Sequence, residues 1–300
     1  MTITTCSAPG KIYFFGEHAV VYGEKAIACA VDLQTRVSVQ PSGEHNISSS
    51  LGTTGLDTVR HPYVTQCIRE MEQYINGCVR IEITSDLPVG SGLGSSAAVT
   101  IATLRALSIQ FDTGHTLDEI AAIGHAIESK VQGAASPTDT FVSTMGGVVT
   151  IPGRKKLSLP GCHIVIGYTG SFSSTRELVA FVRSLKENYP VAIDQIISTI
   201  GSLSGYGEVL IEDSDYIALG GLMDINHGLL DALGVGSKEL SNLVWAARVA
   251  GAWGAKTTGA GGGGCMVAIT DNPEKVADAI RYAGGEAIIT SPAYEGVRVE

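Results

Sequence analysis

The sequence predicts an α+β fold of two domains, with a mixed sheet in each. The chain has 300 residues, of which 44% are hydrophobic and 17% charged, as in globular proteins that are large enough for two cores. Segments of strand-like and helix-like periodicity intermingle without a regular strand–helix–strand alternation, which favours α+β over a doubly wound parallel fold. The polar stretch 153–161, flanked by Gly and Pro, predicts a boundary between residues 1–157 and residues 158–300.

Strands are expected mainly where apolar and polar residues alternate. Val79, Ile81 and Ile83 alternate with polar residues, as in a half-buried strand. Near the N-terminus, two short strands are expected on either side of an APGK turn, which would place Lys11 in that turn. The expected strands of the first domain are residues 2–7, 12–15, 26–40, 78–86 and 147–152, with a loop or hairpin end at 42–55.

Helices are expected where capping residues precede an apolar repeat of helical spacing. Thr116 and Glu119 form a capping-box pattern, and Gly133 is expected to end the helix that follows. Ser136 as N-cap, with Pro137 at the first helical position, predicts the start of another helix. The other helices expected in this domain follow the His-Pro pair at 61–62 and begin at a serine N-cap, position 95 or 96.

The second domain is expected to hold several helices between strands. A strand is predicted at 162–170, and two or three helices across 174–250. A glycine-rich loop at 259–264 is then expected to connect a helix to a strand. The last predicted elements are a helix over 272–284 and a strand near 286–290.

Composition excludes several classes of protein. The net charge of −10, without a cluster of Lys and Arg, argues against binding to nucleic acid. The N-terminal residues lack a signal-peptide pattern, and no apolar run reaches the roughly 18 residues of a membrane span, so we expect a cytoplasmic protein without a membrane partner. The six cysteines form no C-x-x-C pair and are expected to be reduced thiols without structural zinc.

The segment PVGSGLGSSAA, residues 88–98, is the strongest candidate for a ligand site. It places glycines and serines between an expected strand and an expected helix. Glycine lets the backbone approach a ligand closely, and a helix N-terminus offers unpaired N–H groups to an anion. The alternative is a tight turn with a serine cap. No Walker A lysine follows Gly94, and the G-x-G-x-x-G pattern at 259–264 stands in the wrong order of elements for dinucleotide binding. The loop therefore predicts a phosphate site of another kind.

Three segments resemble, in order and spacing, the motifs of the GHMP small-molecule kinases, named after galactokinase, homoserine kinase, mevalonate kinase and phosphomevalonate kinase. They are SAPGKIYFFGEHAVVYG at 7–23, PVGSGLGSSAA at 88–98 and KTTGAGGGGC at 256–265. The resemblance implies an N-terminal ribosomal-S5-like α+β domain and a C-terminal ferredoxin-like domain, with ATP in the cleft between them. The segment GEHAVVYG is similar to family members that act on mevalonate, which implies mevalonate as the second substrate. A homodimer is common in the family and is expected here.

The resemblance also implies how the nucleotide and its metal ion are held. Mg²⁺ prefers hard oxygen ligands, and the family pattern implies that Ser96 and Glu128 bind it. Without the resemblance, Glu128 would be a solvated glutamate near a helix end. The residues implied to wrap the ATP phosphates are Pro88, Val89, Gly90, Ser91, Gly92, Leu93, Gly94, Ser95, Ser96, Ala97 and Ala98.

Catalytic roles are implied for Asp139 and Lys11. In kinases similar to this chain, an Asp at this distance from the metal-binding Glu faces the acceptor hydroxyl. A nearby ammonium would lower the pKa of that hydroxyl and balance negative charge in the transition state. The alternatives are a capping box between Ser136 and Asp139, which is compatible with catalysis, and a surface lysine in a turn.

The resemblance places Glu17 and His18 in the mevalonate pocket, with Ser136 as a further candidate. Gly261 is implied to close over the phosphates or the substrate. The plain alternatives are a core histidine and an ordinary turn between a helix and a strand. The predicted function is Mg²⁺-dependent phosphorylation of mevalonate by ATP. Two alternatives stay open, namely a related kinase for phosphomevalonate, a sugar or an amino alcohol, and a nucleotide-binding regulator without turnover.

Overall fold

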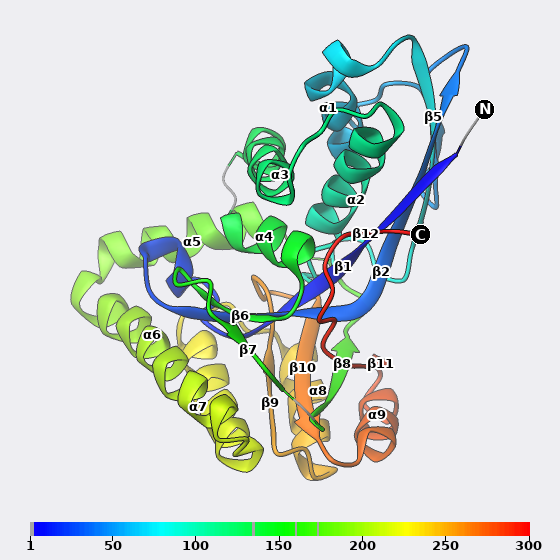
Figure 1. The fold of residues 1–300 in the computed structure, drawn as a ribbon. Coiled ribbons are helices and arrows are strands. Elements are labelled where there is room, and N and C mark those ends of the chain that lie inside the picture. Colours follow the sequence, from blue (N-terminus) through cyan, green and yellow to red (C-terminus); the bar gives the residue numbers. More distant parts are fainter. Residues whose placement is uncertain (1–2, 134–135, 160, 173) are drawn as a thin grey trace.

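Two sheets form the frame of the molecule (Figure 1), for which the computed structural model describes residues 3–133, 136–159, 161–172 and 174–300. The strands of the first sheet are β1 (Thr4–Phe15), β2 (Ala26–Ser42), β3 (Asn46–Ser49), β4 (Gly52–Thr54), β5 (Cys78–Ser85), β6 (Val148–Ile151), β7 (Lys156–Leu157) and β12 (Arg298–Val299). The strands of the second are β8 (His163–Tyr168), β9 (Gly254–Thr257), β10 (Cys265–Thr270) and β11 (Glu286–Thr290). The first sheet has the order β12-β1-β2-β5-β3-β4, with β6 beside β2, and the second has the order β11-β8-β10-β9.

The predicted α+β class is confirmed, but only one of the sheets is mixed. In the first sheet, β3 runs parallel to β5, while β1, β2 and β5 pair antiparallel. The prediction of a mixed second sheet is wrong, because β8, β9, β10 and β11 pair antiparallel throughout the described residues. The glycine-rich loop accounts for one of these pairs, since β9 and β10 are consecutive strands of the hairpin that it closes.

The prediction of two short strands around an APGK turn is also wrong. β1 crosses these residues without a break, and the pairing with β2 only shifts register between Pro9 and Gly10. Pro9 has no N–H to give to the ladder, so the sheet accommodates it at an irregular position rather than at a turn. As a result, Lys11 lies inside the strand and is only 3% exposed.

The first-half helices are α1 (Pro62–Glu70), α2 (Ser95–Gln110), α3 (Leu117–Gln132) and α4 (Pro137–Met145), with the 3-10 helices η1 (Ala19–Tyr22) and η2 (Glu72–Tyr74). The capping box at Thr116 and the glycine stop at Gly133 are confirmed. Ser136 caps α4 as predicted, by accepting from the Thr138 N–H. The serine N-cap of α2 is wrong, because Gly94, with φ +73°, occupies that position. Ser95 and Ser96 are therefore in the first turn of the helix.

The second-half helices are α5 (Thr175–Asn188), α6 (Pro190–Glu212), α7 (Tyr216–Ala232), α8 (Lys238–Val249) and α9 (Pro273–Tyr282). Among the described residues, four of these helices, α5 to α8, lie in the region 174–250, where two or three were expected. The division is set by Pro190, which can begin a helix but not continue one, and by Asp215 and Ser237, whose side chains cap α7 and α8. The predicted helix and strand at the C-terminal end are confirmed as α9 and β11.

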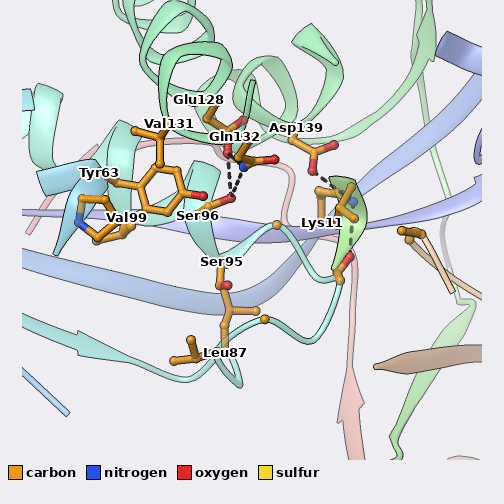
Figure 2. A pocket seen from close by; sticks show the side chains of 18 of the residues that line it. Lys11, Tyr63, Leu87, Ser95, Ser96, Val99, Glu128, Val131, Gln132 and Asp139 are labelled. Carbon is orange, nitrogen blue, oxygen red and sulfur yellow. Dashed lines mark hydrogen bonds and ion pairs between the residues drawn. The ribbon is translucent and has the colours of Figure 1, made fainter. Parts of the chain in front are cut away.

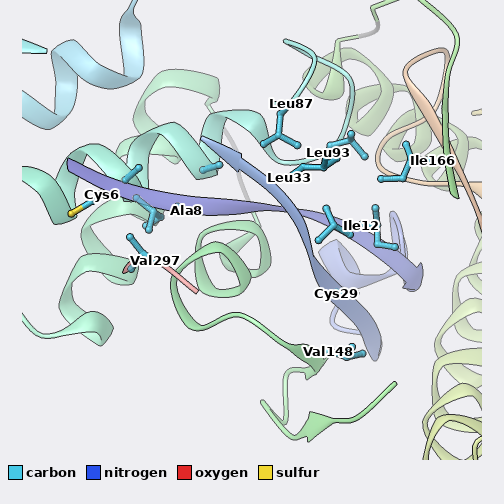
Figure 3. Close-up of a cluster of buried hydrophobic side chains, with 14 of the residues drawn as sticks. Cys6, Ala8, Ile12, Cys29, Leu33, Leu87, Leu93, Val148, Ile166 and Val297 are labelled. Carbon is cyan, nitrogen blue, oxygen red and sulfur yellow. The ribbon is translucent and has the colours of Figure 1, made fainter. Parts of the chain in front are cut away.

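The two halves share one core, which positions the cleft between them. Ile12 of β1 and Leu93 of the loop before α2 belong to the same buried cluster as Ile166 of β8 (Figure 3). The chain finally returns to the first sheet, where β12 pairs with β1 (Figure 1). None of the described helices is long and apolar enough to cross a membrane. All six cysteines are free thiols in the structure, as expected.

Candidate active site

A cleft of about 1040 Å³ lies where the two halves meet. Its walls come from β1, the start of α1, the loop between β5 and α2, the facing ends of α3 and α4, α5, and the loop between β9 and β10 (Figure 2 shows one part of it). The predicted catalytic, metal-binding and acceptor residues that line it are Lys11, Glu17, His18, Ser96, Glu128, Ser136 and Asp139. These residues are far apart in the sequence, and the fold brings them to one cavity.

The loop before α2 presents backbone to this cleft. Gly90, Gly92 and Gly94 have φ values of +69°, +83° and +73°, which side-chain-bearing residues rarely adopt. The N-terminus of α2 also opens on the cleft, so its free N–H groups are available to an anion. Of the eleven residues predicted for this role, the cleft is lined by Val89, Gly90, Gly92, Gly94, Ser95 and Ser96.

The other predicted residues of this loop support it from behind. The Ser91 hydroxyl donates to the Pro88 carbonyl at 2.8 Å. Leu93, Ala97 and Ala98 are completely buried in the core. These residues shape the loop, and their direct contact with phosphate stays a prediction.

Ser96 and Glu128 form the first polar cluster of the cleft. The Ser96 hydroxyl donates to Glu128 Oε1 at 2.6 Å, and the Gln132 amide lies 3.4 Å from both oxygens (Figure 2). Burial above all, together with the negative charge of Asp139, raises the pKa of the Glu128 carboxyl to about 7. A buried carboxylate that is reluctant to ionise next to a hydroxyl is a suitable ligand set for a hard cation, since the cation would compensate the charge.

Asp139 and Lys11 form the second cluster. Lys11 Nζ lies 3.2 Å from Asp139 Oδ2 and donates to the Gly92 carbonyl at 3.3 Å (Figure 2). The Tyr13 hydroxyl donates to Asp139 Oδ1 at 3.3 Å, and the Lys11 ammonium lies over the Tyr13 ring. The capping-box alternative for Asp139 is wrong, because its carboxylate contacts Lys11 and Tyr13 while Ser136 caps the helix alone. The ammonium therefore links the carboxylate to the glycine loop.

His18 and Glu17 face the cleft from the turn after β1. His18 has φ +60°, and its Nε2 donates to the Ala260 carbonyl at 2.9 Å. Burial lowers the pKa of the imidazole and so favours the neutral ring, in which Nδ1 can accept a hydrogen bond while Nε2 donates to Ala260. The Glu17 carboxylate is paired with Lys256, and this pairing limits its freedom to bind a substrate.

The glycine-rich loop of the third motif closes the cleft from the second sheet. It connects β9 to β10, so the expected order of helix, loop and strand is wrong. Gly259 lies so close to the first loop that a Cβ there would be 2.9 Å from the Gly92 carbonyl. Gly261 is not among the cleft-lining residues, and a Cβ there would be 2.1 Å from the Val235 carbonyl. Contact of Gly261 with a substrate stays a prediction.

Sequence reasoning missed several residues of the cleft. Tyr13 and Gln132 contact the predicted side chains, and Arg176 and Arg183 line the wall formed by α5. The two arginines stand seven residues apart, a spacing that places them on one face of a helix and could have been noticed. Tyr13 carries no signal in the sequence that distinguishes it from a core residue of a strand.

Comparison with known proteins identifies the family. The model of the GHMP kinases N terminal domain matches residues 62–147, and that of the GHMP kinases C terminal domain matches residues 208–287. A mevalonate kinase of Pyrococcus abyssi is 44% identical, with 99% of this chain and 98% of the relative covered. A mevalonate kinase of Archaeoglobus fulgidus is 42% identical, with 98% and 99% covered.

Solved structures agree in fold. The crystal structure of the Methanococcus jannaschii mevalonate kinase has a TM-score of 0.82 at 29% identity, over 97% of this chain and 99% of that one. The structure of the L. major mevalonate kinase in complex with R-mevalonate has a TM-score of 0.82 at 24% identity, over 96% and 95%. The matching domain models and the similarity over nearly the whole length lead to one conclusion: the chain belongs to the GHMP kinase family.

Proposed function

We propose that the protein is an enzyme that transfers the γ-phosphoryl group of ATP to the C5 hydroxyl of mevalonate, giving 5-phosphomevalonate and ADP for isoprenoid biosynthesis. The observation that carries the proposal is the convergence of Lys11, Ser96, Glu128 and Asp139 on one cleft beneath a glycine loop. Phosphoryl transfer needs this combination of positioning groups and positive charge more than it needs covalent chemistry. The mevalonate kinases that are 42–45% identical over nearly the full length support the choice of acceptor.

Each group of the cleft has a separate task in this reaction. The N–H groups of the loop and of the first turn of α2 bind the phosphate oxygens. Asp139 accepts a hydrogen bond from the acceptor hydroxyl and orients its oxygen toward the γ-phosphorus. Lys11 keeps Asp139 in place and stabilises the negative charge that develops on the transferred group. The two glycine-rich loops exclude water from the reacting atoms.

Ser96 and Glu128 fit a Mg²⁺ ion, which we propose as the cofactor. A hydroxyl and a carboxylate are sufficient protein ligands for Mg²⁺, because phosphate oxygens and water complete its shell. When bound, the ion supplies positive charge to the β- and γ-phosphates. The raised pKa of Glu128 supports this fit, since burial and the charge of Asp139 outweigh the stabilisation that Ser96 and Lys11 give to the ionised carboxylate.

The proposed Mg²⁺ site predicts a pH-dependent difference in stability between the protein and Glu128→Gln. The pKa of Glu128 rises from its ordinary value of 4.5 to about 7 on folding, so the folded state holds more protons between these values. The free energy of unfolding therefore falls as pH rises through this window, by up to about 3 kcal/mol, and the glutamine variant escapes this loss. Without ligand, the stability of Glu128→Gln relative to the wild type should be clearly greater at pH 8 than at pH 5, as measured by thermal unfolding.

The same experiment has a second arm with ligand. Mg²⁺ with ADP should raise the melting temperature of the wild type more at pH 8 than at pH 6, because binding requires the ionised carboxylate. Mg²⁺ with ADP should raise the melting temperature of Glu128→Gln less than that of the wild type at both pH values. Equal stabilisation of wild type and variant by Mg²⁺ with ADP would remove Glu128 from the metal site.

The acceptor pocket is proposed to contain His18, Glu17 and Ser136, with the positive charge of Arg176 and Arg183 nearby. The neutral His18 ring can accept a hydrogen bond from an acceptor hydroxyl while Nε2 stays on Ala260. His18→Leu should raise the KM for mevalonate about tenfold, as expected for a lost hydrogen bond, and leave the KM for ATP within a factor of about two. Steady-state kinetics with each substrate varied would measure this, and the reverse pattern would move His18 to the nucleotide.

An acceptor panel tests the proposed function itself. ADP release should be measured with mevalonate, phosphomevalonate, galactose and homoserine as acceptors. Mevalonate should have by far the largest kcat/KM, and the product should carry one added phosphoryl group by mass. Preference for another alcohol would identify a different kinase of the family. ATP binding without turnover on any acceptor would identify a regulator.

We also propose a cytoplasmic homodimer and a domain boundary within residues 153–161. The unpaired cysteines are typical of a reducing compartment, and homodimers are common in the family. The boundary is supported by the positions of the two matched domain models on either side of it. Sedimentation analysis would measure the mass in solution, and a monomer would contradict the proposed dimer.

A further inference from the structure

Lys256 is a completely buried lysine at the start of the third glycine-rich motif. It lies in β9, its side chain has no exposed surface, and its ammonium contacts the Glu17 carboxylate and the Thr257 carbonyl. Burying an ammonium is costly unless it is paired, so the partner is what keeps it in place. Lys256 is not among the residues that line the cleft. Any effect on the reaction must therefore pass through another residue.

Glu17 is the residue through which Lys256 reaches the cleft. Its other carboxylate oxygen accepts from the Asn226 amide of α7 at 3.3 Å. Glu17 lines the cleft and stands in the turn that follows β1. The ion pair thus joins a turn of the first sheet to a strand of the second, across 239 positions of sequence.

His18 connects the same two parts a second time. The residue next to Glu17 has the left-handed φ of +60°, and its ring donates to the Ala260 carbonyl in the loop between β9 and β10. A non-glycine residue holds this backbone conformation only when its surroundings impose it. Two contacts impose it here. The neighbouring Glu17 is paired with Lys256 of β9, and the His18 ring is hydrogen-bonded to Ala260 in the loop after β9. Release of Glu17 would let the turn relax and the imidazole leave its place.

We infer that Lys256 is a positioning residue of the acceptor pocket: its ammonium holds Glu17, and thereby holds the turn that carries His18 against the glycine-rich loop. The inference rests on the proposed function for the identity of the acceptor. It gives Glu17 a task other than direct substrate binding. The loop before α2 is hydrogen-bonded to Lys11, whereas the contacts of the Lys256–Glu17 pair are with Thr257 and Asn226. We therefore expect loss of the pair to affect the acceptor more than the nucleotide.

A double-mutant cycle over Glu17→Gln and Lys256→Met tests the inference. If Lys256 acts only through Glu17, the KM for mevalonate should rise about tenfold in each single variant and by the same factor in the double variant. The second substitution has no further effect, because the first has already removed the ion pair. The KM for ATP should stay within about twofold of the wild type in all three. The melting temperature should be lowest in Lys256→Met, which leaves a buried carboxylate without its cation, and should recover in the double variant.

Recovery of stability without recovery of KM separates positioning from a merely structural role. Lys25→Met is the matched control, since Lys25 also pairs two remote segments, through Glu208, but does not line the cleft. It should leave both KM values unchanged.

Three results would overturn the inference. They are a double variant with wild-type KM for mevalonate, multiplied effects of the two changes on that KM, and a double variant that does not fold. If Lys256→Met alone fails to fold, the double variant and Glu17→Gln still decide the question. Wild-type protein without turnover on mevalonate would instead refute the proposed function.

Discussion

Replacing Asp139 by Asn is expected to lower kcat by a factor of about 10²–10⁴, the range for a group that handles the proton of the reacting hydroxyl. The amide keeps the shape of the side chain but loses the negative charge that pairs with Lys11 at 3.2 Å. It also accepts a hydrogen bond from the substrate hydroxyl less strongly than a carboxylate does. The KM for ATP should change little, because the loop before α2, and not Asp139, is proposed to bind the phosphates. Steady-state kinetics with mevalonate and ATP would measure both values.

Asp118→Asn is the matched control for this prediction. Asp118 is also an acidic residue in the first turn of a helix, but it lies on the surface of α3 and does not line the cleft. It should retain wild-type kcat. If Asp139→Asn keeps more than about one tenth of the wild-type kcat, the carboxylate does not participate in the chemical step.

Replacing Lys11 by Met is expected to lower kcat by a factor of about 10²–10³, as for the loss of one preorganised group that stabilises transition-state charge. Methionine is similar in length and apolar, so it suits the buried stem of Lys11, which passes beneath Gly94. The ammonium, however, contacts both Asp139 and the Gly92 carbonyl, and among the described residues no other cation is seen in those two contacts. The KM values for both substrates should stay within about threefold, because the effect concerns the transition state more than the bound substrates.

The exposed Lys130 provides the control for the loss of a lysine charge. It pairs with Glu70 on the surface, so Lys130→Met should leave kcat unchanged. Near-normal turnover in Lys11→Met would remove Lys11 from the mechanism. A large rise in the KM for ATP with normal kcat would instead assign the ammonium to phosphate binding.

Local signals in the sequence predicted those elements whose ends are set by their own residues. The helix from Thr116 to Gly133 has a capping box and a glycine stop, and both act within a few residues. β5 follows from the alternation of Val79, Ile81 and Ile83, since one face of it is buried. Such features need no knowledge of the rest of the chain.

Elements that depend on remote partners could not be predicted in this way. Pro9 and Gly10 indicate a turn, but β2 pairs with β1 on both sides of them and keeps the strand continuous. The Lys11 N–H, just beyond, donates to the Leu93 carbonyl of the phosphate loop at 2.8 Å. The alternative of a surface lysine in a turn is therefore wrong, because contact with residues some eighty positions away buries Lys11.

The residues of the candidate site also differ in whether a local signal in the sequence indicates them. The glycine loop and the residues of the three motifs were predicted because their order and spacing resemble those of a known family. Tyr13 and Lys256 lie inside those motifs but were not predicted as site residues, because nothing beside them in the sequence indicates their partners. The spacing of Arg176 and Arg183 places both on one helix face, but it does not indicate that this face lines the cleft. Lys256 is the first residue of the motif at 256–265, yet its pairing with Glu17 follows only from the packing of β9 against the turn after β1.

The central claim is that the two carboxylates, the serine hydroxyl and the lysine surround a triphosphate and the acceptor hydroxyl. A crystal structure of the protein with Mg²⁺, a non-hydrolysable ATP analogue and mevalonate tests it most directly. We predict the triphosphate on the loop before α2, Mg²⁺ bound by Ser96 and Glu128, and the C5 hydroxyl within hydrogen-bond distance of Asp139. A triphosphate bound away from that loop, or a C5 hydroxyl that faces away from Asp139, would contradict the account.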